Sequence, residues 1–154
     1  MTSFRIERVA EPRPDVVDLI ERHFAAMRSQ SPEESCHVLN ADALFTSGAH
    51  IFVLRDRDDT LGMGAIKPLD EAHGELKSMH TKAEMRGRGI GNALVLHLLE
   101  KARALGLQKV SLETGSEDMF APARRLYERH GFAYCPPFAD YVEDPLSVFM
   151  TRTL

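Results

Sequence analysis

The sequence predicts a mixed α/β (α+β) fold with a twisted, mainly antiparallel sheet of about seven strands and one central parallel pair. Three observations predict it. Two apolar segments flank a polar turn at residues 56–59, which is typical of a β-hairpin. A strand segment, a glycine-rich loop and a long helix follow one another over residues 75–106, and a further strand at 109–113 favours a right-handed parallel crossover. Apolar residues recur at helical spacing over residues 15–27, so a helix precedes the hairpin.

The expected strands are short apolar or alternating segments bounded by turn residues. They cover residues 4–9, 50–55, 60–67, 75–81, 109–113, 132–134 and 147–151. Gly62 and Gly64 lie inside the third segment and indicate a bulge or a close approach of another backbone. Pro136 and Pro137 interrupt the chain between the two closing strands.

Helices are expected at residues 15–27, from Ser31 onward, from the glycine loop to Gly106, and at 123–130. His23 falls on the apolar stripe of the first helix and is interpreted as a packed histidine rather than a ligand. The helix after the glycine loop is expected to bury one stripe, made of Ile90, Leu94, Leu98, Ala102 and Leu105.

Length and composition indicate one domain that spans residues 1–154. Apolar residues make up 44% and charged residues 27% of the chain, which are ordinary globular values. The formal net charge of −4 argues against nucleic acid or an anionic membrane as a partner. The chain has two cysteines, and its seven histidines are scattered without metal-ligand spacing. We therefore expect reduced thiols, no metal, no leader or membrane-spanning segment, and a cytoplasmic location.

The motif with the most chemical information is Arg86-Gly87-Arg88-Gly89-Ile90-Gly91, which joins a strand to a helix. Glycines allow a close approach of the backbone, and the free N–H groups and dipole of a helix N-terminus attract an anion. The two arginines add full positive charges. The motif predicts a phosphate site, with a glycine-rich connection that binds nothing as the alternative. A nucleotide-phosphate enzyme is disfavoured, because the Gly-Lys-[Ser/Thr] motif and acidic metal ligand of such a site are missing from the sequence.

Two signatures in the correct order resemble the GCN5-related N-acetyltransferase (GNAT) superfamily. Arg86, Gly89 and Gly91 fit its [Q/R]-x-x-G-x-[G/A] pattern, and residues 126–132 contain its L-Y-x-x-x-G-F pattern unaltered. The resemblance extends over essentially the whole chain. Similarity to small bacterial members implies the GNAT fold, with helices on both faces of the sheet and the parallel pair splayed at the cofactor site.

The resemblance implies an N-acetyltransferase that moves an acetyl group from acetyl-CoA to a primary amine. Transfer would occur by direct attack on the thioester in a ternary complex, without an acyl-enzyme. The implied cofactor-binding residues, on the loop and the strand before it, are Met79, His80, Thr81, Arg86, Gly87, Arg88, Gly89, Ile90 and Gly91. The expected acceptor is a small-molecule amine or an amino-acid-like amine, with a protein amine and a homodimeric assembly left open. The alternative function is a sensor that binds acetyl-CoA with little or no turnover.

The reaction requires a group that takes a proton from the amine and a group that assists the departing thiolate. Tyr127 is the candidate acid, with a packed core tyrosine as the alternative. Glu75 and Glu113 both lie where the parallel strands would splay. Many similar enzymes carry a glutamate at the position of Glu75, so Glu75 is the preferred base, with Glu113 or a water chain left open. Phe120 departs from the family pattern, since many relatives carry a cofactor-contacting asparagine there.

Overall fold

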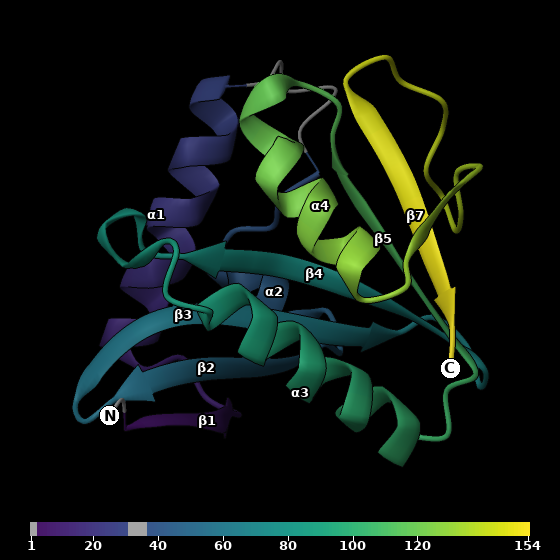
Figure 1. Cartoon of the computed structure of the whole chain (residues 1–154). Helices are drawn as coiled ribbons and strands as arrows, with labels where there is room; N and C mark the ends of the chain where they lie inside the picture. Colours follow the sequence, from purple (N-terminus) through teal and green to yellow (C-terminus); the bar gives the residue numbers. More distant parts are fainter. Residues whose placement is uncertain (1–2, 31–36) are drawn as a thin grey trace.

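The chain forms a seven-stranded sheet with the strand order β1-β2-β3-β4-β5-β7-β6 (Figure 1). The computed structural model describes residues 3–30 and 37–154. The strands are β1 (Phe4–Val9), β2 (His50–Asp56), β3 (Asp59–Pro68), β4 (His73–Thr81), β5 (Lys109–Gly115), β6 (Ala133–Cys135) and β7 (Ser147–Thr153). Neighbouring strands are antiparallel except for β4 and β5, which are parallel. The predicted mixed sheet with its central parallel pair is thus confirmed.

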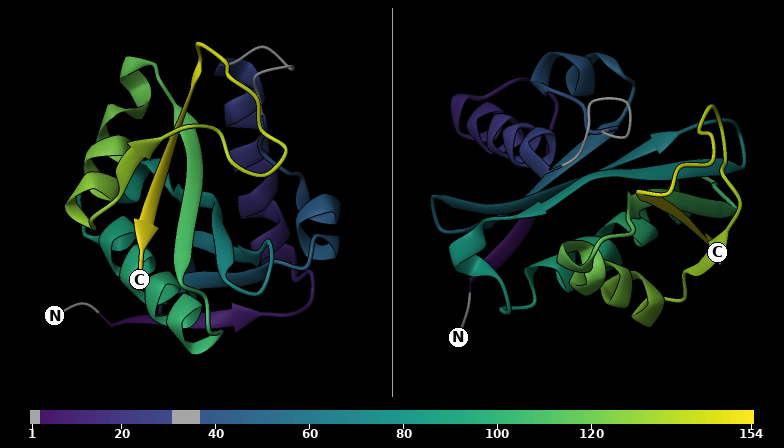
Figure 2. Two further views of the ribbon diagram at one scale, coloured as in Figure 1. Left: turned by 90° about the vertical axis from the view of Figure 1, so that its right-hand side faces the viewer. Right: turned by 90° about the horizontal axis from the view of Figure 1, so that it is seen from above.

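Helices cover both faces of this sheet (Figure 2). α1 (Pro14–Gln30) and α2 (Ala41–Thr46) pack on one face, while α3 (Ile90–Ala104) and α4 (Ala121–Arg129) pack on the other. The short 3-10 turns η2 (Ala83–Met85) and η3 (Asp118–Phe120) precede α3 and α4. A separate cluster of buried hydrophobic side chains lies on each face. None of the helices in the described part of the chain has the length and apolar character that crossing a membrane requires.

The predicted helix start at Ser31 lies outside the described residues. The second helix that the structure describes, α2, begins later, after Asn40. The Asn40 side chain caps it, because its Oδ1 accepts a hydrogen bond of 2.9 Å from the Ala43 N–H.

The buried stripe of α3 was predicted correctly except at its end. Four of its members are buried: Ile90, Leu94, Leu98 and Ala102. Leu105 is 37% exposed, so its placement in the stripe was wrong. The helix ends at Ala104, and Leu105 is the C-cap, where the chain leaves the helical path towards Gly106 at φ 82°.

α3 lies very close to β3 because two glycines of β3 have no side chain. A Cβ atom on Gly62 would lie 2.8 Å from Cγ2 of Ile90, and one on Gly64 would lie 2.8 Å from Cδ1 of Leu98. The register between β3 and β4 also shifts between Met63 and Ala65. The register shift agrees with the predicted bulge, while the close approach of α3 is made by its side chains rather than by another backbone.

The two parallel strands separate soon after they meet. β4 and β5 pair only from His73 with Lys109 to Glu75 with Ser111. Further along β4, Ser78 has a φ of 56°, a left-handed conformation that costs about 1–2 kcal/mol for a residue with a Cβ atom. Past Glu75, no strand among the described residues pairs with the edge of β4 that faces β5. The backbone N–H and C=O groups of this edge are thus available to a ligand.

Candidate functional site

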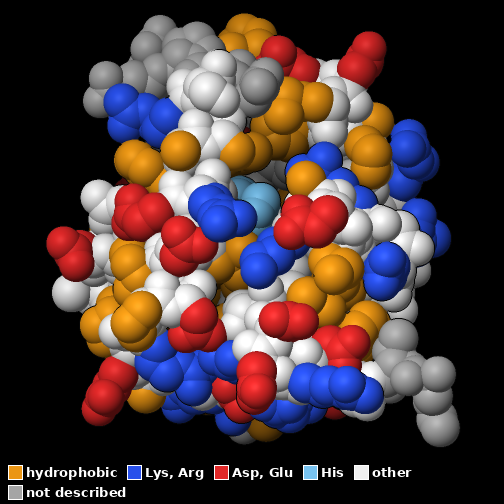
Figure 3. Space-filling model, turned by 90° about the vertical axis from the view of Figure 1, so that its left-hand side faces the viewer, with side chains coloured by type: hydrophobic (Ala, Val, Ile, Leu, Met, Phe, Trp, Pro, Cys, Tyr) orange, Lys and Arg blue, Asp and Glu red, His pale blue; other side chains and the backbone are white. Residues whose placement is uncertain are grey.

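A cavity of about 790 Å³ lies where β4 and β5 separate. Its walls come from α1, the outer half of β4, the loop before α3, the end of β5, α4 and the loop between β6 and β7. Seen from the side of α1, the molecular surface is hollowed near its centre, with a histidine side chain in the hollow and hydrophobic side chains on its rim (Figure 3). The cavity has one end at the glycine loop and another among carboxyl groups.

The glycine loop has the backbone geometry of an anion site. Gly87 and Gly89 both have a φ of 81°, which glycine adopts without steric cost. Gly89 is the N-cap of α3, and its C=O accepts the first helical hydrogen bond, 3.0 Å from the Ala93 N–H. The N–H groups of residues 90–92 come before this ladder, so together with the helix dipole they favour an anion.

Charged side chains add to this end of the cavity. Arg86 and Arg129 both line it. The C-terminal end of α4, which carries Arg129, is held at the first turn of α3 by a contact of 2.7 Å between His130 Nε2 and Asn92 Oδ1. Arg88 is exposed and is the only residue of the predicted cofactor set that does not line the cavity.

Two histidines connect α1 to β4 in the cavity wall. Nδ1 of His23 lies 3.2 Å from Nδ1 of His80, so one ring donates a hydrogen bond and the other accepts it. Burial lowers the pKa of His23 to about 3 and that of His80 to about 4, with Arg86 adding to the effect on His80. Both rings are therefore neutral near pH 7. His23 is a packed histidine as predicted, and it also borders the cavity.

At the other end of the cavity, Glu75 is already engaged by two partners. Its side chain is 5% exposed, and its Oε2 accepts hydrogen bonds from Lys77 Nζ at 3.1 Å and from the Tyr141 hydroxyl at 2.5 Å. Lys77 Nζ also donates to the Tyr141 oxygen at 3.2 Å. Burial and the neighbouring Glu75 raise the pKa of Tyr141, so its phenol stays protonated.

Glu113 has a different environment from Glu75. It lies two residues beyond Ser111 on β5, and strand alternation directs both side chains to the same face of the sheet. Burial raises the pKa of Glu113 to about 7, against the nearby Ser147 hydroxyl and the positive charge of Lys77, which both lower it. A carboxyl group with this pKa can take up a proton at neutral pH.

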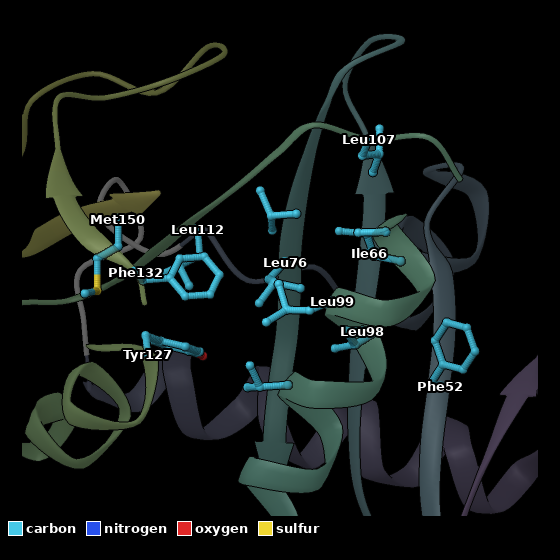
Figure 4. Close-up of a cluster of buried hydrophobic side chains, with 13 residues drawn as sticks. Phe52, Ile66, Leu76, Leu98, Leu99, Leu107, Leu112, Tyr127, Phe132 and Met150 are labelled. Atoms are coloured by element: carbon cyan, nitrogen blue, oxygen red, sulfur yellow. The ribbon is translucent and has the colours of Figure 1, made fainter. Parts of the chain in front are cut away.

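Tyr127 approaches the cavity from α4. It is 6% exposed, and its ring centroid lies 5.9 Å from that of Phe132 in the buried cluster (Figure 4). Figure 4 shows its hydroxyl directed away from α4 towards β4, and the residue lines the cavity. Burial and the charge of Glu113 raise the pKa of Tyr127, so its phenol remains a hydrogen-bond donor.

Phe120 occupies a place that the sequence alone did not suggest. Its ring lies where a Cβ atom on Gly115 would be, so only glycine at the end of β5 allows this packing. The residue lines the cavity. It therefore supplies an apolar part of the cavity wall.

Sequence reasoning missed Lys77 and Tyr141. Lys77 follows Glu75 by two residues on β4, so strand alternation was a signal that could have placed the two side chains together. Tyr141 comes from the loop between β6 and β7, which carries no motif. Within the described residues, no group of three or more His, Cys, Asp or Glu is arranged to hold a metal ion.

Comparisons with known proteins agree with this geometry. The family model described as acetyltransferase (GNAT) family matches residues 14–132. The chain is 45% identical over 139 residues to the uncharacterized N-acetyltransferase YsnE from Bacillus subtilis, a match that covers 90% of this chain and 92% of that protein. It is 40% identical over 141 residues to the uncharacterized N-acetyltransferase YedL from Escherichia coli, with 92% and 89% covered.

Solved structures show the same architecture. A Klebsiella pneumoniae protein assigned as an acyl-CoA N-acyltransferase superposes with a TM-score of 0.80 at 28% identity, covering 99% of this chain and 98% of that one. A Bacillus subtilis acetyltransferase in complex with CoA has the same fold, with a TM-score of 0.73 at 19% identity and 99% of each chain covered. The family match spans both signatures and most of the described sheet. The chain belongs to the acetyltransferase (GNAT) family.

Proposed function

We propose that the protein transfers the acetyl group of acetyl-CoA to a primary amine by direct attack on the thioester. The observation that supports this most is a single cavity that joins the N-terminus of α3 to a carboxyl group with a pKa of about 7. The first feature suits a phosphate-bearing acyl donor, and the second suits the removal of a proton from an ammonium group.

The cavity has features that fit the pyrophosphate, the pantetheine arm and the thioester of acetyl-CoA. The N–H groups of residues 90–92 and the side chain of Arg86 suit the pyrophosphate. The unpaired edge of β4 over residues 76–81 offers backbone groups to the two amides of the pantetheine arm, as a sheet edge does to an added strand. This assignment places the thioester near the point where β4 and β5 separate, between Tyr127 and Glu113.

We assign the proton-accepting role to Glu113 rather than to Glu75, the residue preferred from the sequence. Glu75 is held by Lys77 and Tyr141, whereas Glu113 has a pKa at which it can gain and lose a proton. The ammonium group of the acceptor gives one proton to Glu113, and the neutral nitrogen then forms a bond to the acetyl carbon while the C–S bond breaks. The nitrogen loses its second proton to solvent as the amide forms. The Tyr127 hydroxyl donates a hydrogen bond to the departing thiolate, which then takes a proton from solvent.

Measuring both acetyl-CoA binding and turnover distinguishes an acetyltransferase from a sensor that only binds acetyl-CoA. Acetyl-CoA affinity is measured by calorimetry, and thiol release is followed with a pool of primary amines whose products are identified by mass. We expect amine-dependent thiol release and one acetylated amine for each thiol. The Glu113→Gln variant should keep its acetyl-CoA affinity and lose turnover, while the exposed control Glu117→Gln should behave as the wild type. Tight binding without thiol release for any amine would support the sensor instead.

A further inference from the structure

The charged residues of the cavity wall are separated by sign. The cations Arg86 and Arg129 lie at the glycine-loop end, where α3 and α4 meet. Among the described residues, the other end holds two carboxyl groups, Glu75 and Glu113, and one cation, Lys77. The histidines His23 and His80 in the wall are neutral and do not change this balance near pH 7.

The one cation at the carboxyl end is already paired. Lys77 Nζ donates to Glu75 at 3.1 Å and to the Tyr141 oxygen at 3.2 Å, and it also lies over the Tyr141 ring at 5.8 Å from its centroid. Its positive charge pairs with the carboxylate of Glu75. Because Glu75 is only 4% exposed, water does not solvate that carboxylate in place of Lys77. Because the charge of Lys77 acts on Glu113 as well, one positive charge is shared between two carboxyl groups on this side.

The walls around these groups are aromatic and apolar. The Tyr141 ring is fixed by edge and tilted contacts with His37, Phe138 and Phe149, with centroids 5.0, 5.0 and 5.5 Å away. Apolar lining residues near this end are Val38, which follows His37 in the chain, and Leu146, which precedes Ser147 beside Glu113. A ligand at this end therefore meets a rigid ring and aliphatic surface next to negative charge.

We propose that the acetyl acceptor is an arylalkylamine without a carboxylate on the carbon that bears the amine. This inference rests on the proposed acetyl transfer and names its substrate class. The ammonium group of such an amine balances the charge of Glu113, and its ring packs against Tyr141. An amino acid would bring a third carboxylate to a site whose one cation is already shared.

Three matched acceptors test the proposal: 2-phenylethylamine, phenylalanine and phenylalaninamide. They share the aromatic ring, and the amide has nearly the bulk of the acid without its charge. With saturating acetyl-CoA, we expect kcat/KM for phenylethylamine and for the amide to exceed that for phenylalanine by at least about tenfold. The Lys77→Met variant should keep the same order of the three acceptors, because Lys77 does not bind a substrate carboxylate.

Other outcomes overturn specific parts of the inference. Phenylalanine as the best acceptor, with a selective loss in Lys77→Met, would make this an amino-acid site while leaving acetyl transfer intact. An amide as poor as the acid would attribute the selectivity to bulk and remove the charge argument. Binding of acetyl-CoA with no acetylated product from these amines or from a broad amine pool would refute the proposed function itself.

Discussion

At the scale of single residues, Glu113 and Tyr127 differ from their counterparts in water because both are shielded from solvent. Burial disfavours the charged form of each group, which raises the pKa of the Glu113 carboxyl to about 7 and keeps the Tyr127 phenol protonated. The cavity wall thus contains a carboxyl group with a pKa of about 7 and a protonated phenol.

The pH dependence of the reaction tests Glu113. Only its ionised form accepts a proton, so kcat/KM should rise with pH through about 7 and level off above it. Glu113→Gln should remove this limb and lower the rate by about 10²–10⁴-fold. Rate profiles between pH 5.5 and 9 for both proteins check the expectation. A limb near pH 7 that persists in the variant would assign the titration to another group.

A conservative change at Tyr127 separates its two possible roles. Tyr127→Phe keeps the ring in contact with Phe132 and removes only the hydroxyl. If that hydroxyl stabilises the thiolate, kcat should fall by about 10²-fold while acetyl-CoA affinity and Tm barely change. Steady-state rates, calorimetry and thermal unfolding measure the three quantities. A lower Tm with weaker binding and unchanged kcat would make Tyr127 a packing residue alone.

At the scale of elements, the glycine loop can be tested with a matched control elsewhere in the chain. Gly89 and Gly106 have nearly the same φ, 81° and 82°, and a Cβ atom on either would meet nothing within 4 Å. Valine at either position should therefore cost similar stability through backbone strain. Only Gly89→Val should also weaken binding of CoA, because it distorts the N-cap of α3.

Calorimetry with CoA and desulfo-CoA on both folded variants measures this difference. The two ligands should lose affinity alike, since the loop contacts phosphate and not sulfur. Equal affinities in Gly89→Val and Gly106→Val would mean that the loop does not bind the cofactor.

Local patterns explain how much could be predicted from the sequence. The strands, the parallel crossover and the glycine loop depend on neighbouring residues, so periodicity and turn chemistry predict them. The end of α3 was harder, because Leu105 continues the apolar spacing although the helix stops one residue earlier. The contact of Tyr141 with Glu75 joins residues 66 apart, and no local pattern indicates it. The choice of Glu75 over Glu113 from the sequence did not take Lys77 into account, and the positive charge of Lys77 acts on both carboxyl groups.

At the scale of the whole molecule, the histidine pair between α1 and β4 makes the stability of the folded protein depend on pH. His23 and His80 are neutral in the folded protein, with pKa values of about 3 and 4, but titrate near 6.5 when unfolded. Below pH 6.5 the unfolded state binds more protons, so stability should fall as pH decreases, by up to about 1.4 kcal/mol per pH unit for each group. Urea unfolding between pH 4.5 and 7.5 measures this slope.

The matched variant for this prediction is His23→Gln, which can still hydrogen-bond the His80 ring. It should be less stable than the wild type near pH 7 and should lose less stability on acidification, since one titrating group is gone. An acid slope that is the same in both proteins would place the sensitivity in other groups.

The central claim of the account is that one cavity holds donor and acceptor together and that the acetyl group passes directly between them. Intact-mass measurement of the protein after incubation with acetyl-CoA alone, followed by the addition of an acceptor amine, tests it most directly. We predict an unmodified protein and no thiol release before the amine is added, then one acetylated amine for each thiol released. An acetylated protein that passes its acetyl group to the amine after removal of acetyl-CoA would contradict it.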